Sequence, residues 1–188
     1  SFFEQRKAMN NPKATRFPSV TVAVPAYNEE ATIVATVKSL LALDYPKDKL
    51  CIMVIDDGSA DNTYELAKQF EKDGVQVFTK ENTGKGDSLN FALSKCTTEM
   101  FGALDADSFV APDCLKKMVG YFSKKKVMAV TPSLKIWKPK NLWQHIQAIE
   151  FLLGVYLRKV FAHFGSIHVT PGPFTIYRKS FFDKYGGY

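Results

Sequence analysis

Two carboxylates near the middle of the chain have a spacing that suits a divalent cation. Asp105 and Asp107 directly follow the apolar run 101–104 and are separated by one alanine. One of them could bind the cation and the other could act through water or a ligand hydroxyl, and hard oxygen ligands suit Mg²⁺ or Mn²⁺. A solvated turn that caps a helix is the alternative for this pattern taken alone. The position after an apolar run favours the metal site.

A second acidic pair, Asp56 and Asp57, also follows an apolar run and precedes Gly58. Adjacent carboxylates repel each other unless one of them meets a hydrogen-bond donor or a cation. A uracil-like ring offers an N–H group, and a ribose offers hydroxyl groups. The alternative is a tight turn closed by Gly58, in which Asp57 bonds its own backbone. The pair is a candidate contact for a nucleoside.

The glycine-containing segment 82–86 resembles a phosphate-binding loop. Its glycines expose backbone N–H groups, and Lys85 adds a cation at the start of an expected helix. The segment is not a Walker A motif, because Thr79 stands where the first glycine of that motif should be. Lys85 is a candidate contact for a diphosphate or a base, with a surface lysine on a turn as the alternative.

Short apolar runs and helical patterns alternate along the chain and supply the elements that must position these residues. Runs of apolar and β-branched residues predict strands, and apolar residues three or four positions apart predict helices. Asp61 or Asn62 could cap the second helix. The expected strands cover residues 20–25, 51–55, 75–78, 101–104 and 127–134. The expected helices cover residues 33–41, 62–72, 88–95, 113–122 and 142–164.

This alternation predicts an α/β fold with a Rossmann-like, mainly parallel sheet, flanked by helices and joined by right-handed crossovers. A chain of 188 residues is expected to form one domain. Ligands of such sheets bind beyond the carboxyl ends of the strands. Each polar cluster follows an expected strand or opens a helix. We therefore expect four distant segments to lie together: 27–29, 56–57, Lys85 and 105–107.

Taken in order, these clusters resemble the motifs of family 2 glycosyltransferases. The resemblance rests on residues 25–30, 55–63, 82–86 with 89–90, and 104–107. The chain is especially similar to the membrane-associated branch that includes cellulose, chitin and hyaluronan synthases, in which Lys85 and the stretch 171–179 have counterparts. The resemblance covers residues 18–188 and implies a GT-A fold with an incomplete C-terminal part. Residues 1–17 are then an N-terminal extension or linker.

The resemblance implies that a sugar is transferred with inversion from a nucleoside-diphosphate sugar, UDP-linked, to a polysaccharide or lipid-linked acceptor. It implies Mg²⁺ or Mn²⁺ as the cofactor, with Asp107 as the more direct ligand beside Asp105. It places Gly172 and Pro173 on the acceptor side. The residues that it assigns to the nucleotide sugar are Pro25, Ala26, Tyr27, Glu29, Asp57, Lys85 and Asp105.

The sequence departs from the family pattern in the region of the catalytic base. The family continues after a Gly-Gly-Tyr region to an Asp that acts as general base, and processive members add a Gln-x-x-Arg-Trp motif. Neither occurs here, so we expect the base beyond Tyr188 and do not assign it to Asp183. One alternative is a nucleotide-binding fragment without activity. Another is an aspartate-nucleophile phosphatase, in which Asp105 is the nucleophile that becomes phosphorylated. That alternative leaves segments 27–29 and 56–57 without roles.

The net charge of +6 is divided unequally, because acidic residues outnumber basic ones before residue 114 and basic residues dominate after it. The basic half could face phosphates, nucleic acid or an anionic membrane. Nucleic acid is the least favoured of these, because the lysines are not part of a recognisable nucleic-acid-binding fold. The apolar face of the expected helix 142–164 suits core packing or an interfacial helix. No run reaches the roughly 20 apolar residues of a membrane span. We expect a soluble fragment of a parent bound to the cytoplasmic face of a membrane.

Cysteines and histidines show no ligand spacing. An odd number of cysteines without such spacing indicates reduced thiols and a cytoplasmic compartment. The histidines are expected to be structural, although His168 lies close to the acceptor segment. The cysteines are Cys51, Cys96 and Cys114, and the histidines are His145, His163 and His168.

Overall fold

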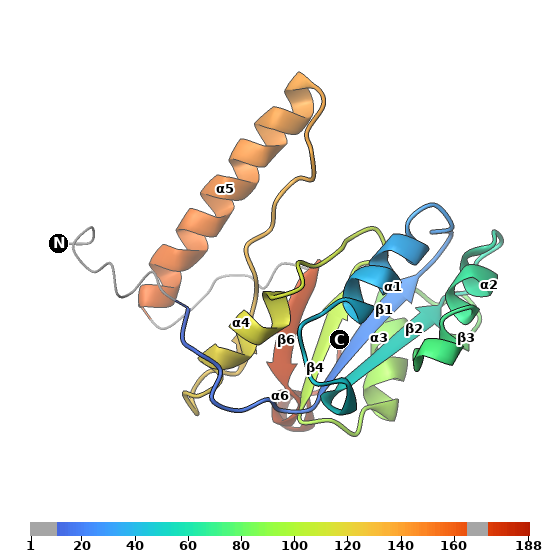
Figure 1. The fold of residues 1–188 in the computed structure, drawn as a ribbon, viewed down its shortest axis with the longest axis horizontal. Coiled ribbons are helices and arrows are strands. Elements are labelled where there is room, and N and C mark those ends of the chain that lie inside the picture. The colour runs from blue at the N-terminus through green and yellow to red at the C-terminus, as the bar shows by residue number, and fades with distance from the viewer. Residues whose placement is uncertain (1–10, 165–172) are drawn as a thin grey trace. The chain divides into compact units, whose positions relative to one another are not determined.

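The computed structural model describes residues 11–164 and 173–188, in which strands and helices alternate (Figure 1). The strands are β1 (Val20–Ala26), β2 (Leu50–Asp56), β3 (Gln76–Thr79), β4 (Met100–Leu104), β5 (Ala129–Val130) and β6 (Phe174–Arg178). The α-helices are α1 (Ile33–Leu41), α2 (Thr63–Lys68), α3 (Lys85–Lys95), α4 (Cys114–Tyr121), α5 (Leu142–His163) and α6 (Lys179–Tyr185). The short 3-10 helices are η2 (Lys47–Lys49) and η3 (Glu71–Asp73).

The six described strands form one sheet in the order β3-β2-β1-β4-β6-β5. β1 pairs in parallel with β2 and with β4, and β2 pairs in parallel with β3. β6 runs antiparallel to both β4 and β5. The strand order reverses at β1, since the chain moves outward to β3 and returns to the other side of β1 as β4. The predicted mainly parallel α/β sheet is confirmed, and its switch point lies between β1 and β4.

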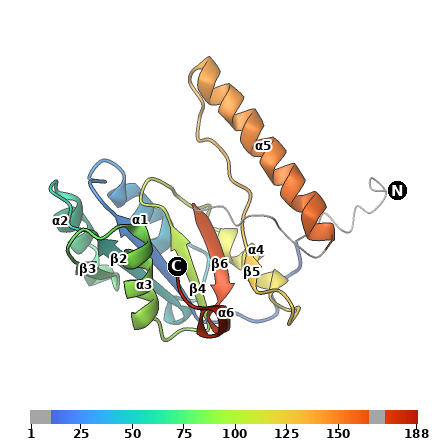
Figure 2. The ribbon, with the colours of Figure 1, turned by 180° about the vertical axis from the view of Figure 1, so that it is seen from behind.

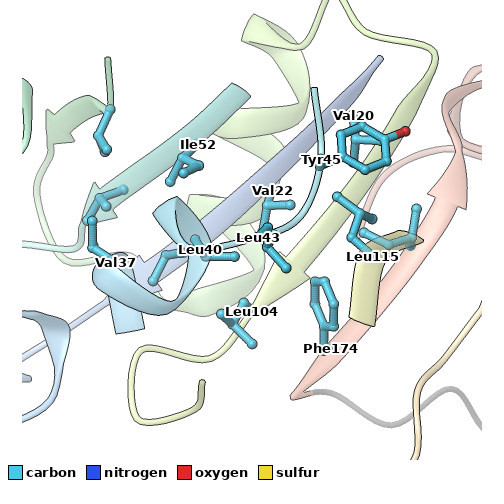
Figure 3. Packing of buried hydrophobic residues seen from close by; sticks show 14 of the residues in the cluster. Val20, Val22, Val37, Leu40, Leu43, Tyr45, Ile52, Leu104, Leu115 and Phe174 are labelled. Atoms are coloured by element: carbon cyan, nitrogen blue, oxygen red, sulfur yellow. The ribbon is translucent and has the colours of Figure 1, made fainter. Parts of the chain in front are cut away.

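Helices cover both faces of this sheet, as the two views in Figures 1 and 2 show. Side chains alternate between the faces of a strand, so Val20 and Val22 of β1 enter one core and Ala23 enters the other. The first core receives α1 and α4, with Leu40 and Leu115 fully buried (Figure 3). The second core receives α3 and α6. Both helix layers hold the sheet in place and leave the carboxyl ends of its parallel strands accessible.

The chain divides into two compact units, residues 1–130 with 172–188 and residues 131–171. The first unit contains the sheet. The second unit contains α5. Asn141 is the N-cap of this helix, and its side chain accepts a hydrogen bond from the backbone N–H of Gln144 at 2.9 Å. No helix among the described residues is long and apolar enough to cross a membrane.

Several elements differ from the sequence-based expectation. The strand expected over 127–134 is confined to Ala129–Val130, because Pro132 has no N–H group to continue the ladder. β6 was not predicted as a strand, although Phe174, Thr175 and Ile176 are buried in it. α3 also begins three residues earlier than expected, at Lys85, after Gly84 adopts a positive φ of 97°.

Candidate functional site

One pocket lies beyond the carboxyl ends of β1, β2 and β4, at the first turn of α3. All seven residues predicted to bind a nucleotide sugar line it, and so does the second predicted metal ligand. The four segments predicted to converge therefore surround one pocket within the first unit. The lining residues are Pro25, Ala26, Tyr27, Glu29, Asp57, Lys85, Asp105, Ala106 and Asp107.

The loop after β1 is a strained turn that presents an aromatic side chain to the pocket. Tyr27 is 51% exposed, and Asn28 has a φ of 55°, which asparagine tolerates better than most residues. The side-chain oxygen of Asn28 accepts from the backbone N–H of Ala60 at 2.9 Å. The backbone N–H of Asn28 donates to Ser59 Oγ at 2.9 Å. These two bonds attach the turn to the loop after β2.

Further hydrogen bonds join the loops after β1 and β2 and order each loop internally. The backbone N–H of Glu29 donates to Oγ1 of the fully buried Thr63 at 2.7 Å. The carboxylate of Glu29 accepts from Thr32 Oγ1, also at 2.7 Å. Asp61 accepts from the backbone N–H of Glu30 at 3.1 Å and from that of Thr63 at 3.0 Å. Of the two predicted caps of α2, Asp61 is therefore the one whose side chain bonds the helix start.

The acidic pair at the end of β2 finds its donors within the chain. Asp56 is 2% exposed and accepts from Thr79 Oγ1 at 2.9 Å. Asp57 is 4% exposed and accepts from the backbone N–H groups of Thr83 at 3.1 Å and Gly84 at 2.8 Å. The alternative, in which Asp57 bonds the backbone of its own turn, is wrong, because the backbone N–H groups that Asp57 accepts from belong to the glycine-containing loop.

Lys80, which the sequence analysis did not single out, completes the environment of Asp57. Its ammonium forms an ion pair with Asp57 Oδ1, and the two side chains are only 17% and 5% exposed. Burial raises the pKa of the Asp57 carboxyl, but the hydrogen bonds from Lys80, Thr83 and Gly84 outweigh that effect and lower the pKa below its ordinary value. One sequence signal for Lys80 existed, since it directly follows β3 and so lies at the same edge of the sheet.

Lys85 and Asp105 form a second ion pair inside the pocket. Lys85 is the first residue of α3, at the helix end where the first backbone N–H groups have no carbonyl acceptor within the helix. The side chains are 51% and 25% exposed, so solvent screens the pair more than it screens Lys80 and Asp57. The lysine therefore stands where it could exchange this carboxylate for another anion.

Asp107 lies exposed at the pocket, and its Oδ1 accepts from Ser108 Oγ at 3.2 Å. The described residues contain no group of three or more His, Cys, Asp or Glu side chains that could hold a metal ion. Mg²⁺ sites at phosphates commonly use one or two carboxylates and complete their shell with phosphate oxygens and water. The pair Asp105 and Asp107 fits that kind of shared site and does not fit a cage made by protein alone.

On the predicted acceptor side, the backbone carbonyl of Pro173 accepts from the N–H of Asp105 at 3.1 Å, while Gly172 lies outside the described residues. Among the histidines, His145 is on α5 in the second unit, whereas His168 and the side chain of His163 lie outside the described part. The cysteines are free thiols, as expected from their spacing: Cys51, Cys96 and Cys114.

Comparisons with known proteins identify the family to which this α/β sheet belongs. Residues 21–186 match the family described as glycosyl transferase family 2, and the chain belongs to this family. Poly-beta-1,6-N-acetyl-D-glucosamine synthase of Staphylococcus epidermidis is 33% identical over 86% of this chain and 40% of its own length. Beta-monoglucosyldiacylglycerol synthase of Nostoc sp. is 34% identical over 91% of this chain and 38% of its own length. The chain thus spans about 40% of the curated relatives it matches.

Solved structures show the same fold. The mannosyltransferase PcManGT from Pyrobaculum calidifontis, in complex with GDP-Man and Mn²⁺, superposes with a TM-score of 0.72 at 26% identity, over 94% of this chain and 49% of that one. S. aureus TarS 1-349, in complex with UDP-GlcNAc, gives a TM-score of 0.66 at 21% identity, over 88% and 46%. The sheet and its helices therefore have the GT-A arrangement of glycosyltransferases.

Proposed function

We propose that the pocket binds a nucleoside-diphosphate sugar, UDP-linked, and that the chain is the donor-binding part of a metal-dependent, inverting glycosyltransferase. The observation that carries this proposal is that residues from four separate segments line one pocket. Family membership and the names of relatives and neighbours support it. The activity is proposed for the whole protein, since the chain spans only part of its relatives' length.

The proposal gives each pocket residue a task suited to its chemistry. Pro25, Ala26 and the half-exposed ring of Tyr27 contact the face of the base. The ionised carboxylate of Asp57 accepts an N–H group of the base, because a carboxylate can only accept. The carboxylate of Glu29 approaches the ribose hydroxyls. These groups come from loops that hydrogen bonds fix to each other, so the base site is largely preorganised.

The remaining charged residues lie where a diphosphate and its metal would be. Lys85 leaves its partner Asp105 for the diphosphate or the base, and Asp105 then contacts the sugar nucleotide. Asp107, with Asp105, would hold Mg²⁺ or Mn²⁺, and PcManGT, whose structure was solved with Mn²⁺, supports this. The bound metal would offset negative charge on the departing nucleoside diphosphate.

Transfer then needs an acceptor hydroxyl that attacks the anomeric carbon opposite the leaving diphosphate, and this single displacement inverts the carbon. Pro173, hydrogen-bonded through its carbonyl to Asp105, and Gly172 border the acceptor side in this proposal. We assign no catalytic base among the described residues. Asp183 is engaged elsewhere, since it accepts from Lys179 at 2.7 Å one helical turn away.

The proposed acceptor is a polysaccharide or a lipid-linked acceptor at the cytoplasmic face of a membrane. The names of two relatives support this proposal, because poly-beta-1,6-N-acetyl-D-glucosamine synthase is named for a polysaccharide and beta-monoglucosyldiacylglycerol synthase for a glycolipid. Support for membrane association comes from α5, which carries apolar side chains that its own unit leaves exposed, and from the basic residues near it. No nucleic acid is required as a partner.

Calorimetric titration with UDP, with and without Mn²⁺, tests the proposal. The wild-type chain is expected to bind UDP more tightly when Mn²⁺ is present. Asp107→Asn should lose most of this metal-dependent gain, about tenfold in affinity, because one ligand charge is removed. Asp73→Asn is the matched control, since Asp73 is an exposed carboxylate outside the pocket.

Two results would contradict the proposal. The first is metal-independent nucleotide binding that Asp107→Asn leaves unchanged. The second is the absence of nucleotide binding by a chain whose circular dichroism shows that it is folded. Nucleotide binding without sugar transfer by the whole protein would favour a non-catalytic nucleotide-binding role. Release of phosphate from a generic phosphomonoester, without release of nucleoside diphosphate from a sugar nucleotide, would favour the phosphatase alternative.

A further inference from the structure

The ammonium of Lys80 has an acceptor for each of its three N–H donors. It pairs with Asp57 Oδ1, donates to Thr83 Oγ1 at 2.6 Å and donates to the backbone carbonyl of Glu81 at 3.0 Å. A surface lysine normally keeps its ammonium in water, whereas this side chain is only 17% exposed. The cost of partial dehydration is offset by the complete set of bonds. Lys80 is therefore a fixed part of the structure and not a mobile surface charge.

These bonds also determine what remains free on Asp57. Oδ1 accepts from Lys80 and from the backbone N–H of Thr83, and Oδ2 accepts from the backbone N–H of Gly84. A carboxylate has about four acceptor sites, so about one site stays available, and it lies on Oδ2. Asp57 also lines the pocket. Asp57 thus presents one free acceptor site to the pocket, and three donors hold its carboxylate in orientation.

We propose that Lys80 sets the base selectivity of the pocket as a positioning residue, by orienting Asp57 so that its one free acceptor site takes a ring N–H of the base. Uracil and guanine present such an N–H on their pairing edge. Cytosine and adenine present a ring nitrogen lone pair there, which a carboxylate repels. This inference rests on the proposed function, because it deepens the role of Asp57 in the same pocket.

The charged surroundings of Asp57 make Lys80 its main electrostatic partner. Lys85 is paired with Asp105, and Asp56 is bonded to Thr79. The other carboxylates at the pocket disfavour a second negative charge. The titratable and charged groups around Asp57 are Asp56 on β2, Lys80 after β3, Lys85 on α3, Glu29 after β1, and Asp105 and Asp107 after β4. Without Lys80, the pKa of Asp57 rises, and the protonated acid can donate to cytosine as well as accept from uracil.

The experiment compares the affinities for UDP and CDP in the presence of Mn²⁺. The two ligands share the ribose and the diphosphate, so the ratio of their affinities reports only on the base. We expect Lys80→Met to lower the affinity for UDP about tenfold and the affinity for CDP less than about threefold, so that discrimination falls. The loss should grow as the pH is lowered from about 8 to about 5. Lys80→Gln, which keeps donors without the charge, is a second variant in case Lys80→Met folds poorly. Lys72→Met, at an exposed lysine, is the matched control.

A purely structural role for Lys80 predicts a different result. If Lys80 only folded the glycine-containing loop, both variants would weaken UDP and CDP by the same factor, and the ratio would stay at its wild-type value at every pH. That outcome, or an unchanged affinity for UDP, overturns the inference while leaving the proposed function intact. If the folded wild-type chain binds neither diphosphate, the proposed function fails, and the inference fails with it.

Discussion

Asp57 is the residue where structural and ligand-binding roles meet. Its carboxylate holds the glycine-containing loop through Thr83 and Gly84 and still lines the pocket. A charged acceptor with three donors is expected to stabilise the fold, because hydrogen bonds to ionised groups contribute more than neutral ones. The structural role of Asp57 and its role as a ligand contact are therefore compatible, and both can be tested by replacing this residue.

Replacement of Asp57 should make stability less dependent on acid pH. The pKa of Asp57 is lowered from its ordinary value of 3.8 in the folded chain, so its contribution is fully present above that value and is lost as the pH falls through the lowered pKa. Asp57→Asn should cost about 1–3 kcal/mol at neutral pH, and the difference from wild type should shrink below about pH 4. Thermal unfolding of both proteins between about pH 7 and about pH 3 measures this difference in stability.

The control for this series is Asp73→Asn, which changes an exposed carboxylate. Its unfolding midpoint should follow that of the wild-type chain throughout. A difference between wild type and Asp57→Asn that stays constant down to about pH 3 would show that the charge of Asp57 does not contribute.

At the scale of elements, the loops after β1 and β2 behave as one unit. Asn28 is bonded to Ser59 and Ala60, and Glu29 is bonded to Thr63 at the start of α2. Because the two strands are parallel neighbours in register, both loops leave the sheet at the same edge. The residues between Gly58 and α2 therefore act mainly as a support for the pocket residues of the preceding loop.

Thr63→Val tests this support with a nearly isosteric change. It removes the acceptor of the Glu29 N–H group and leaves that donor unsatisfied, so we expect a loss of about 1–3 kcal/mol in the free energy of unfolding. Urea unfolding measures the loss. Thr97→Val, at an exposed threonine, is the control and should change stability by less than about 0.5 kcal/mol. Equal effects of the two substitutions would refute the supporting role.

At the scale of the whole molecule, the described part of the second unit contributes none of the residues that line the pocket. Its helix α5 bears many large apolar side chains that are exposed, including Trp143, Ile149 and Leu153. The basic residues on and before it are Lys135, Lys138, Lys140, Arg158 and Lys159. Apolar and basic groups on one helix suit either the surface of an anionic membrane or packing against another part of the protein.

Recruitment to vesicles separates these two uses of α5. Vesicles that contain anionic lipid should bind the chain at low salt and release much of it at about 0.5 M salt, where charges are strongly screened. The double substitution Trp143→Ser with Leu153→Ser should reduce binding, whereas Gln147→Ser on the same helix should not. If these vesicles fail to recruit the wild-type chain at low salt, a protein-facing or solvated surface explains the basic half better.

The sequence by itself determined the class of fold and the composition of the pocket. Apolar periodicity is local, so it identified most strands and helices, and parallel strands place their carboxyl ends on one edge, so four distant segments could be expected to converge. Their order was specific enough to indicate the family to which the chain belongs.

Only the tertiary structure decided how the pocket is held. The contact of Lys80 with Asp57 joins the ends of two neighbouring strands. The place of Lys80 after β3 indicates the edge of the sheet where it lies, but no local pattern indicates its partner. The same holds for β6, whose antiparallel place between β4 and β5 depends on a chain reversal far along the sequence. Pairing across a sheet is a long-range interaction, whereas the signals that a sequence displays most clearly are those of neighbouring residues.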